Sequence, residues 1–374
     1  MGSSGVADPD RRKPLGRRRR KMQRVTMTDV ARLAQVSPST VSLFLRRPDA
    51  VSGAAGARIA AAVDQLGYVP NLVAGGLAAA ASRVVSIIVP SVRNAFFADT
   101  VAALQAALAP RGLQVLLGHT EYALDQEEML VRTALSWAPA AIVLTGLAHS
   151  RATRQLLLAA AVPVIEIWEL GGEPIDMAVG FAHRDVGAVV TRHLLARGHR
   201  CLAFLGARMQ QDRRAHQRAQ GFAAAVTEGH HGGAPMILDH PAAASAEVGG
   251  QLLAQALARQ AALDAVVCSN DHIALGVLFE AQRRGLAVPE QLSVAGFGDL
   301  PFAASCVPPL TTVRPSGDEI GRQVARLILR RLETGPLPVD ERVVDTGFRL
   351  IERQSVQARA LRAGQLRLEE PATP

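Results

Sequence analysis

Two short helical patterns joined by a tight turn fill residues 25–42, and no other feature of this chain limits its fold as strongly. Val30, Leu33 and Ala34 are apolar at the spacing of one helix face. Thr28 is placed to act as the N-cap of that helix, because its hydroxyl can accept a hydrogen bond from the first turn. The segment therefore begins with a short amphipathic helix.

The second helix of this pair begins at Ser37, an expected N-cap, with Pro38 in the first turn, where a missing N–H costs nothing. Val41, Phe44 and Leu45 are expected to face inward. Two short helices joined in this way predict a helix-turn-helix, whose second helix enters the major groove of DNA; an ordinary helical hairpin is the alternative. The positions left exposed for such contacts are Ser39, Thr40, Ser42, Leu43 and Arg46.

The length and charge of the chain agree with a DNA-binding element attached to larger domains. The chain has 374 residues, 49% of them hydrophobic, so two or three domains are expected. Its formal net charge is +8, and a run of Arg and Lys occupies residues 11–24, directly before the helix-turn-helix. Such a tail is expected to be disordered when free and to add salt-dependent affinity for DNA without sequence preference.

The composition also predicts a cytoplasmic protein without metal or cofactor. No apolar run is long enough to span a membrane, and the basic run leads into polar residues, unlike a secretory signal. Cys201, Cys268 and Cys306 are scattered, without the spacing of metal ligands, and are expected to be free thiols.

Beyond residue 83 the pattern changes to short apolar runs separated by segments of helical length. Continuous apolar strands of this kind predict parallel sheets covered by helices on both faces, an α/β architecture. Two similar lobes with a cleft between them accommodate so many strands best, and ligands are then expected beyond the carboxyl ends of the strands. The runs are 84–89, 113–117, 141–144, 162–167, 177–181, 201–205, 265–268 and 292–297.

Domain boundaries follow from these patterns. A third helix is expected over 53–66, and Gly67 and Pro70 end it. The expected segments are a basic tail (1–24), a DNA-binding domain (25–70), a hinge or linker (71–82), a two-lobed domain (83–350) and a C-terminal tail (351–374). Within the two-lobed domain, the first lobe is expected over about 83–181 and 313–345, and the second over about 182–312.

Signatures of enzymes are missing from the sequence. It contains no G-x-G-x-x-G, Walker, G-x-S-x-G or H-E-x-x-H motif. Residues 90–93, which follow the first predicted strand, are Pro-Ser-Val-Arg and do not form a glycine-rich phosphate loop. An enzyme is therefore not expected.

The order and spacing of these motifs resemble those of the lactose-repressor family of bacterial transcription regulators over residues 25 to about 350. The likeness rests on stretches in both parts of the chain, and within the family the sequence is most similar to gluconate-type repressors. The head motifs include Asp29-Val30-Ala31, Thr40-Val41-Ser42 and Leu66-Gly67-Tyr68; those of the larger domain include Arg197-Gly198-His199-Arg200, Ser269-Asn270-Asp271 and Pro308-Pro309-Leu310-Thr311-Thr312; those of the gluconate branch include His119-Thr120-Glu121-Tyr122 and Ala178-Val179-Gly180-Phe181.

The resemblance implies a homodimer that binds a palindromic operator in double-stranded DNA. It also implies a hinge helix over 71–82, with Leu77 placed to enter the minor groove; a plain Ala-rich linker is the alternative. Two departures stand in the recognition region: Leu43 replaces a common base-reading Arg, which favours contact with a thymine methyl, and Gln35 replaces a frequent turn Gly. The DNA-binding residues implied are Thr28, Ser37, Pro38, Ser39, Thr40, Ser42, Leu43, Arg46, Tyr68, Asn71 and Leu77.

The resemblance further implies that a small-molecule effector binds between the lobes and alters the affinity for DNA. Gly298 stands where relatives that bind neutral sugars commonly carry an Asp, and Arg208, Arg213, Arg214 and Arg218 form an Arg cluster that could pair with a carboxylate. A missing carboxylate and available Arg side chains suit an acidic ligand, so a sugar acid such as gluconate or a ketogluconate is expected. The effector residues implied are Ser91, Phe96, Phe97, Trp168, Phe181, Arg208, Arg218, Asn270 and Gly298.

Two alternatives remain open from the sequence. The same kind of regulator could sense a neutral or a phosphorylated sugar, because Arg side chains also suit phosphate. A periplasmic-type sugar-binding protein shares the two α/β lobes, but it would need a secretory signal and no DNA-binding head.

Overall fold

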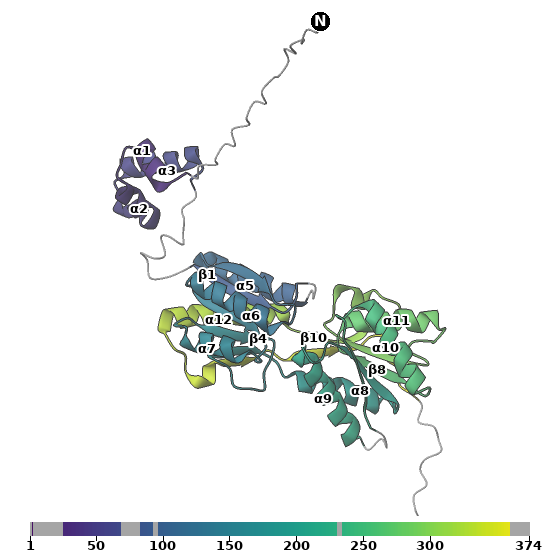
Figure 1. Cartoon of the computed structure of the whole chain (residues 1–374). Helices are drawn as coiled ribbons and strands as arrows, with labels where there is room; N and C mark the ends of the chain where they lie inside the picture. Colours follow the sequence, from purple (N-terminus) through teal and green to yellow (C-terminus); the bar gives the residue numbers. More distant parts are fainter. Residues whose placement is uncertain (1, 3–24, 69–82, 93–95, 230–233, 360–374) are drawn as a thin grey trace, which may run out of the picture. The chain divides into compact units, whose positions relative to one another are not determined.

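A computed structural model describes residues 2, 25–68, 83–92, 96–229 and 234–359, and the side chains of Arg46 and Phe96 are outside this description. The chain divides into two compact units, Met1–Ala80 and Ala81–Pro374 (Figure 1). The expected hinge over 71–82 lies outside the described residues, as do nearly all of the N-terminal tail and most of the C-terminal one.

The first unit is a small helical head. Its third helix has the predicted bounds, and its first two form a helix-turn-helix. The elements are α1 (Met27–Ala34), α2 (Pro38–Arg46), the 3₁₀ turn η1 (Pro48–Ala50) and α3 (Gly53–Leu66).

The N-cap of α1 is Thr26, and the expectation that Thr28 would cap this helix is wrong. The Thr26 hydroxyl accepts a hydrogen bond from the Asp29 N–H (3.3 Å), and the Asp29 carboxylate accepts one from the Thr26 N–H (3.0 Å). This reciprocal capping box satisfies two backbone donors at once, which Thr28 has no acidic partner to do. Ser37 caps α2 as expected, accepting from the Thr40 N–H (3.1 Å).

The helices of the head pack around one apolar cluster that includes Val30, Val41, Ile59 and Tyr68. Leu33 does not join it and is 43% exposed, contrary to the expected inward face. In a helix of only eight residues, the buried stripe is set by Val30, Ala31 and Ala34, and Leu33 lies at its edge.

The turn between α1 and α2 places Gln35 in the left-handed region (φ 54°, ψ 48°), the conformation for which glycine is favoured. The Gln35 N–H closes the end of α1 by donating to the Arg32 carbonyl. The turn thus keeps its geometry without a glycine, at a conformational cost.

The first lobe of the second unit contains a six-stranded sheet in the order β11-β5-β4-β3-β1-β2, with every pair parallel. Helices α5 and α12 pack together, as do α6 and α7. The strands are β1 (Val84–Val89), β2 (Gln114–His119), β3 (Ala141–Thr145), β4 (Val164–Ile167), β5 (Met177–Gly180) and β11 (Val343–Asp345); the helices are α5 (Phe96–Leu108), α6 (Leu124–Ser136), α7 (Arg151–Ala159) and α12 (Gly317–Thr334), with 3₁₀ turns η2 (Ala109–Arg111) and η4 (Val339–Glu341).

The second lobe contains another six-stranded sheet, β12-β10-β9-β8-β6-β7, in which only β12 runs antiparallel. Helices α8 and α9 pack together, and α10 packs on α11. The strands are β6 (Leu202–Ala207), β7 (Met236–His240), β8 (Ala265–Cys268), β9 (Ser293–Phe297), β10 (Thr311–Pro315) and β12 (Phe348–Ile351); the helices are α8 (His183–Ala196), α9 (Arg213–Glu228), α10 (Ala246–Arg259) and α11 (Asp271–Arg283), with a 3₁₀ turn η3 (Pro301–Ala304).

The chain passes between the lobes after β5, β10 and β11. The return to the first lobe lies beyond Pro315 rather than before residue 313, because β10 pairs with β9 and β12 as part of the second sheet.

Each apolar run that was expected to be a strand overlaps an observed strand. Strands β7, β10, β11 and β12 were missed; β7, β11 and β12 are half exposed and lack a continuous apolar pattern. Across the described residues, no helix is long and apolar enough to cross a bilayer.

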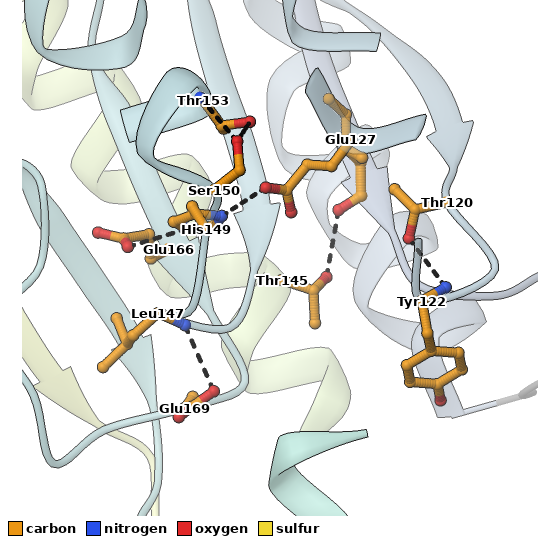
Figure 2. A network of polar contacts seen from close by, with 11 residues as sticks. Thr120, Tyr122, Glu127, Thr145, Leu147, His149, Ser150, Thr153, Glu166 and Glu169 are labelled. Atoms are coloured by element: carbon orange, nitrogen blue, oxygen red, sulfur yellow. Dashed lines mark hydrogen bonds and ion pairs between the residues drawn. The ribbon is translucent and has the colours of Figure 1, made fainter. Parts of the chain in front are cut away.

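A buried ionic cluster lies within the first lobe, where His149 is held between two carboxylates (Figure 2). Its Nδ1 lies 2.8 Å from Glu127 Oε1 and its Nε2 lies 3.1 Å from Glu166 Oε1. The remaining Glu166 oxygen accepts the Ile175 N–H (2.5 Å). Although burial alone lowers it, these hydrogen bonds raise the pKa of His149 to about 9, so the imidazole is charged at neutral pH.

Replacing Gln35 by glycine is expected to stabilise the head by up to about 1 kcal/mol, because glycine adopts the left-handed conformation without the cost borne by other residues. The measurement is the free energy of opening of α1 and α2 from amide hydrogen exchange. Gln35→Ala is the control and should show no gain. An equal gain in both variants would contradict the explanation.

The His149 cluster predicts a pH-dependent loss of stability in the second unit. Because the folded pKa of about 9 lies above the ordinary value of 6.5, the contribution is fully present below pH 6.5 and is lost as the pH rises through 9. Thermal unfolding between pH 6 and 9.5 should show a falling Tm that His149→Gln flattens. His119→Gln, at a half-exposed histidine, should leave the slope unchanged. A wild-type slope in the His149 variant would refute this assignment.

Candidate functional site

The exposed side of α2 presents hydroxyl groups at the start of the helix. Ser37 Oγ lies 2.7 Å from Ser39 Oγ and 2.8 Å from Thr40 Oγ1. No acidic residue occupies this first turn, so the positive end of the helix is left open to a phosphate. Ser39 and Leu43 are exposed, and Thr40 and Ser42 are half buried.

The other DNA-binding candidates fall in different places. Thr28 is exposed on the first turn of α1, whereas Tyr68 is only 8% exposed and packs in the core of the head. Asn71 and Leu77 lie outside the described residues, and so does the side chain of Arg46.

In the second unit, a small cavity of about 10 Å³ lies where the carboxyl ends of strands from both sheets meet. Trp168 follows β4, Phe297 ends β9, and Tyr122 lies beyond β2. This is the expected place for a ligand in such a fold. The lining residues are Phe97, Tyr122, Trp168, His183, Asp212, Arg214, Arg218 and Phe297. A wider groove of about 340 Å³ lies between α10 and α11 on helix surfaces, away from those strand ends, and its polar lining residues are Glu247, Gln251, Glu280 and Arg283.

Arg218 is the central charged group of the cavity and is only 5% exposed. Its Nη2–H donates to the Ser269 carbonyl (2.8 Å), and its Cζ lies 4.1 Å above the centre of the Phe297 ring. Its Nε–H has no hydrogen-bond partner. Burial lowers the pKa of Arg218 to about 10, so the guanidinium still carries its charge at neutral pH.

His183 fixes the orientation of this guanidinium. The Arg218 Nη1–H donates to His183 Nδ1 (2.8 Å), and His183 Nε2 lies 2.7 Å from the Trp168 carbonyl. The imidazole accepts at one nitrogen and donates at the other, so it is neutral. Burial and the neighbouring Arg218 and Arg214 charges hold the pKa of His183 well below its usual value, in agreement with that state.

Glycines bring α8 and α9 close enough for the Arg218–His183 contact. A Cβ added at Gly187 of α8 would lie 1.9 Å from the Arg218 carbonyl oxygen, and one added at Gly221 of α9 would lie 1.9 Å from that of Arg184. The two helices therefore touch backbone to backbone. No larger residue fits at either position without separating them.

The acidic side of the cavity is formed by Asp212, the N-cap of α9, which accepts from the Ala215 N–H (3.2 Å). Arg214 Nη2 lies 3.8 Å from Asp212 Oδ1. Burial and the Asp212 carboxylate raise the pKa of the nearby Tyr122 hydroxyl, which stays protonated. Outside the lining, Gln217 Nε2 of the second lobe donates to Glu169 Oε1 of the first (2.6 Å).

The carboxylate of Asp299, next to Gly298, is engaged elsewhere. It forms ion pairs with Arg314 of β10 and with Arg353 (2.7 Å), and its side chain is 5% exposed. Gly298 itself adopts φ 130° and does not line the cavity. No Asp side chain from this loop therefore reaches the cavity.

Of the effector residues expected from the sequence, the structure brings Phe97, Trp168 and Arg218 to the cavity wall. Phe181 is buried directly behind, with its ring centre 6.0 Å from that of Trp168. Ser91 donates to Glu121 (3.4 Å), and Asn270 caps α11 by accepting the Ile273 N–H. The expectation that Ser91, Phe181, Arg208, Asn270 and Gly298 would line the site does not match this cavity, and the side chain of Phe96 is outside the described set.

Four lining residues were not named as candidates: Tyr122, His183, Asp212 and Phe297. Phe297 and His183 lie at or just after predicted strand ends, and this position is the signal in the sequence that points to both. Arg214 had been noted only as part of an Arg cluster. Arg208, from the same cluster, donates instead to the Pro241 carbonyl (3.3 Å).

Comparisons with known proteins agree with these two units. The family described as "Bacterial regulatory proteins, lacI family" matches residues 26–71, and a periplasmic binding protein-like domain matches residues 191–356. The HTH-type transcriptional regulator GntR of Pseudomonas aeruginosa is 37% identical over 332 residues, which cover 89% of this chain and 96% of that protein. The HTH-type transcriptional regulator IdnR of Escherichia coli is 34% identical over 328 residues, covering 87% and 97%.

A solved structure shows the same arrangement of elements. The crystal structure of a LacI family transcriptional regulator from Silicibacter pomeroyi has a TM-score of 0.83 and 32% identity, and it covers 89% of this chain and 99% of that one. Both units are thus shared with regulators over nearly their whole length. The chain therefore belongs to the lacI family of bacterial regulatory proteins, DNA-binding regulators of transcription that respond to ligands and are not enzymes.

Proposed function

We propose that this regulator is a homodimeric repressor that binds a palindromic operator and whose affinity for it is set by a sugar acid of the gluconate or ketogluconate type. The observation that carries the ligand class is the buried Arg218, whose Nε–H has no partner at the wall of the cavity. A buried, unpaired N–H donor is costly, and a carboxylate acceptor satisfies it with a charge-assisted hydrogen bond.

The charges of the cavity favour a monoanion. Arg214 and Arg218 are cationic, Asp212 is anionic and His183 is neutral, so the lining carries one net positive charge. A sugar acid neutralises that charge. A sugar phosphate dianion would exceed it and would face Asp212 at close range. A neutral sugar would leave the buried Arg218 charge uncompensated.

The other residues that line the cavity suit a polyhydroxylated ligand. Asp212 and the Tyr122 hydroxyl offer hydrogen bonds, while Trp168, Phe97 and Phe297 provide apolar faces. The likeness of the segment around Tyr122 to gluconate-type repressors points the same way.

On the DNA side, the proposed contacts are made by the exposed positions of α2. Ser39, Thr40 and Ser42 are assigned to bases or phosphates, Arg46 to a phosphate or guanine edge, and Leu43 to a thymine methyl. Two such helices in a symmetric dimer require a near-palindromic operator.

A thermal-shift panel with gluconate, 2-ketogluconate, 6-phosphogluconate and glucose tests the ligand class. A sugar acid at about 100 times its Kd should stabilise the chain by about 2.7 kcal/mol, while glucose should leave the Tm unchanged. Arg218→Met keeps much of the side-chain volume without the charge and should weaken gluconate binding at least about tenfold. Arg213→Ala, at the exposed start of α9, is the control. Stabilisation by glucose alone would exclude an acidic ligand.

Asp212→Asn should change the preference between anions. Asparagine also caps helices, so α9 is preserved, but the net charge of the lining rises by one. The ratio of the Kd values for 6-phosphogluconate and gluconate is expected to shift at least about tenfold towards the phosphate. Asp185→Asn, an equal charge change at an exposed position of α8, should leave that ratio unchanged. An unaltered ratio in Asp212→Asn would show that this carboxylate does not select the ligand.

A further inference from the structure

We infer that Thr100 is a positioning residue that couples the occupancy of the cavity to helix α12, through a continuous buried chain of hydrogen bonds. The inference rests on the proposed function in taking the cavity as the effector site. Trp168 lines that site, whereas Thr100 and Gly317, which continue the path to α12, do not.

The chain begins at the cavity with groups already described. Arg218 donates to His183, whose other nitrogen bonds to the backbone carbonyl of Trp168. This step carries the path from the second lobe, where α8 and α9 lie, to the first lobe at the end of β4. Trp168 occupies the left-handed region (φ 67°), a backbone conformation that few residues other than glycine adopt.

The indole extends the path away from the cavity. Trp168 Nε1–H donates to Thr100 Oγ1 (3.1 Å), and the Thr100 hydroxyl donates in turn to the Gly317 carbonyl (2.8 Å). Thr100 and Trp168 are each 1% exposed. Because a hydroxyl has one proton, Thr100 accepts from the cavity side and donates to the helix side, which makes it a link that a methyl group cannot replace.

Gly317 is the first residue of α12, and only Ser316 separates it from β10, after which the chain crosses to the first lobe. Close packing joins α12 firmly to α5 at this point. A Cβ added at Gly321 would lie 2.5 Å from the Thr100 carbonyl oxygen and 2.8 Å from Ala103 Cβ. A displacement at Thr100 is therefore passed to both helices rather than absorbed between them.

The burial of the path is the reason for expecting coupling along it. A ligand that pairs with Arg218 or contacts Trp168 changes the position of groups whose hydrogen bonds have no water to replace them. The Trp168 indole therefore cannot move independently of Thr100. The test therefore reads both ends of the path.

Hydrogen exchange of the full-length chain with and without D-gluconate provides that test. In the wild type, gluconate should slow exchange in α9 at the cavity and in the first turns of α12, the latter at least about fivefold. Thr100→Val, which keeps the shape but removes the hydroxyl, should retain protection in α9 and a gluconate Kd within about threefold of wild type, while losing protection in α12. Thr100→Ser, which keeps a hydroxyl, should restore the protection of α12.

Thr191→Val is the matched control, because Thr191 is also fully buried but its hydroxyl donates within its own helix, to Gly187 (2.7 Å). In this variant, gluconate should still slow exchange both in α9 and in the first turns of α12. Protection of α12 in Thr100→Val, or an equal loss of gluconate affinity and of α12 protection, overturns the coupling role.

A failure of the ligand class is distinguishable from a failure of this inference. If gluconate does not bind the wild type, the proposed ligand is wrong, and His183→Asn then serves as the perturbation at the cavity end. In ligand-free protein it should alter exchange at the start of α12 when Thr100 is present and not in the Thr100→Val background. No change in either background refutes the path.

Discussion

The arrangement of the cavity in the second unit depends on the contacts of one buried charge, the guanidinium of Arg218. Removing a charge from water is costly unless polar partners replace the lost hydration. Here the Ser269 carbonyl, the neutral His183 imidazole and the face of Phe297 do so, and each comes from a different element of the second lobe. His183 extends the arrangement to the first lobe through Trp168. A single charge thus orients groups in both lobes and leaves one donor for a ligand.

The sequence predicted the local parts of this molecule well, for physical reasons that differ between elements. Ser37 and Pro38 determine the start of α2 by themselves, whereas the start of α1 depends on the reciprocal bond between Thr26 and Asp29, and Thr28 was chosen wrongly. Buried strands such as β1 follow from continuous apolar runs. The edge strands β7 and β11 have no such pattern, because solvent covers much of their surface.

The candidate site was only partly predictable for a related reason. Arg218 and Trp168 were found from family motifs and their positions in the chain. His183 and Asp212 gain their roles from the approach of α8, α9 and the first lobe, which requires glycines at 187 and 221 that carry no chemical signal of their own. Under the proposed function, the preference for a carboxylate over a phosphate ligand rests on the charge of Asp212, whose place at the cavity has no signal in the sequence.

The enclosure of the cavity has a consequence for rates. Phe97, Trp168, His183 and Arg218 are each at most 5% exposed, and one apolar core cluster contains residues of both lobes. Under the proposed function, a ligand larger than a water molecule requires the lobes to move apart, because the cavity itself has only about 10 Å³ of room. Its association is then gated by this opening motion and runs below the rate of free encounter.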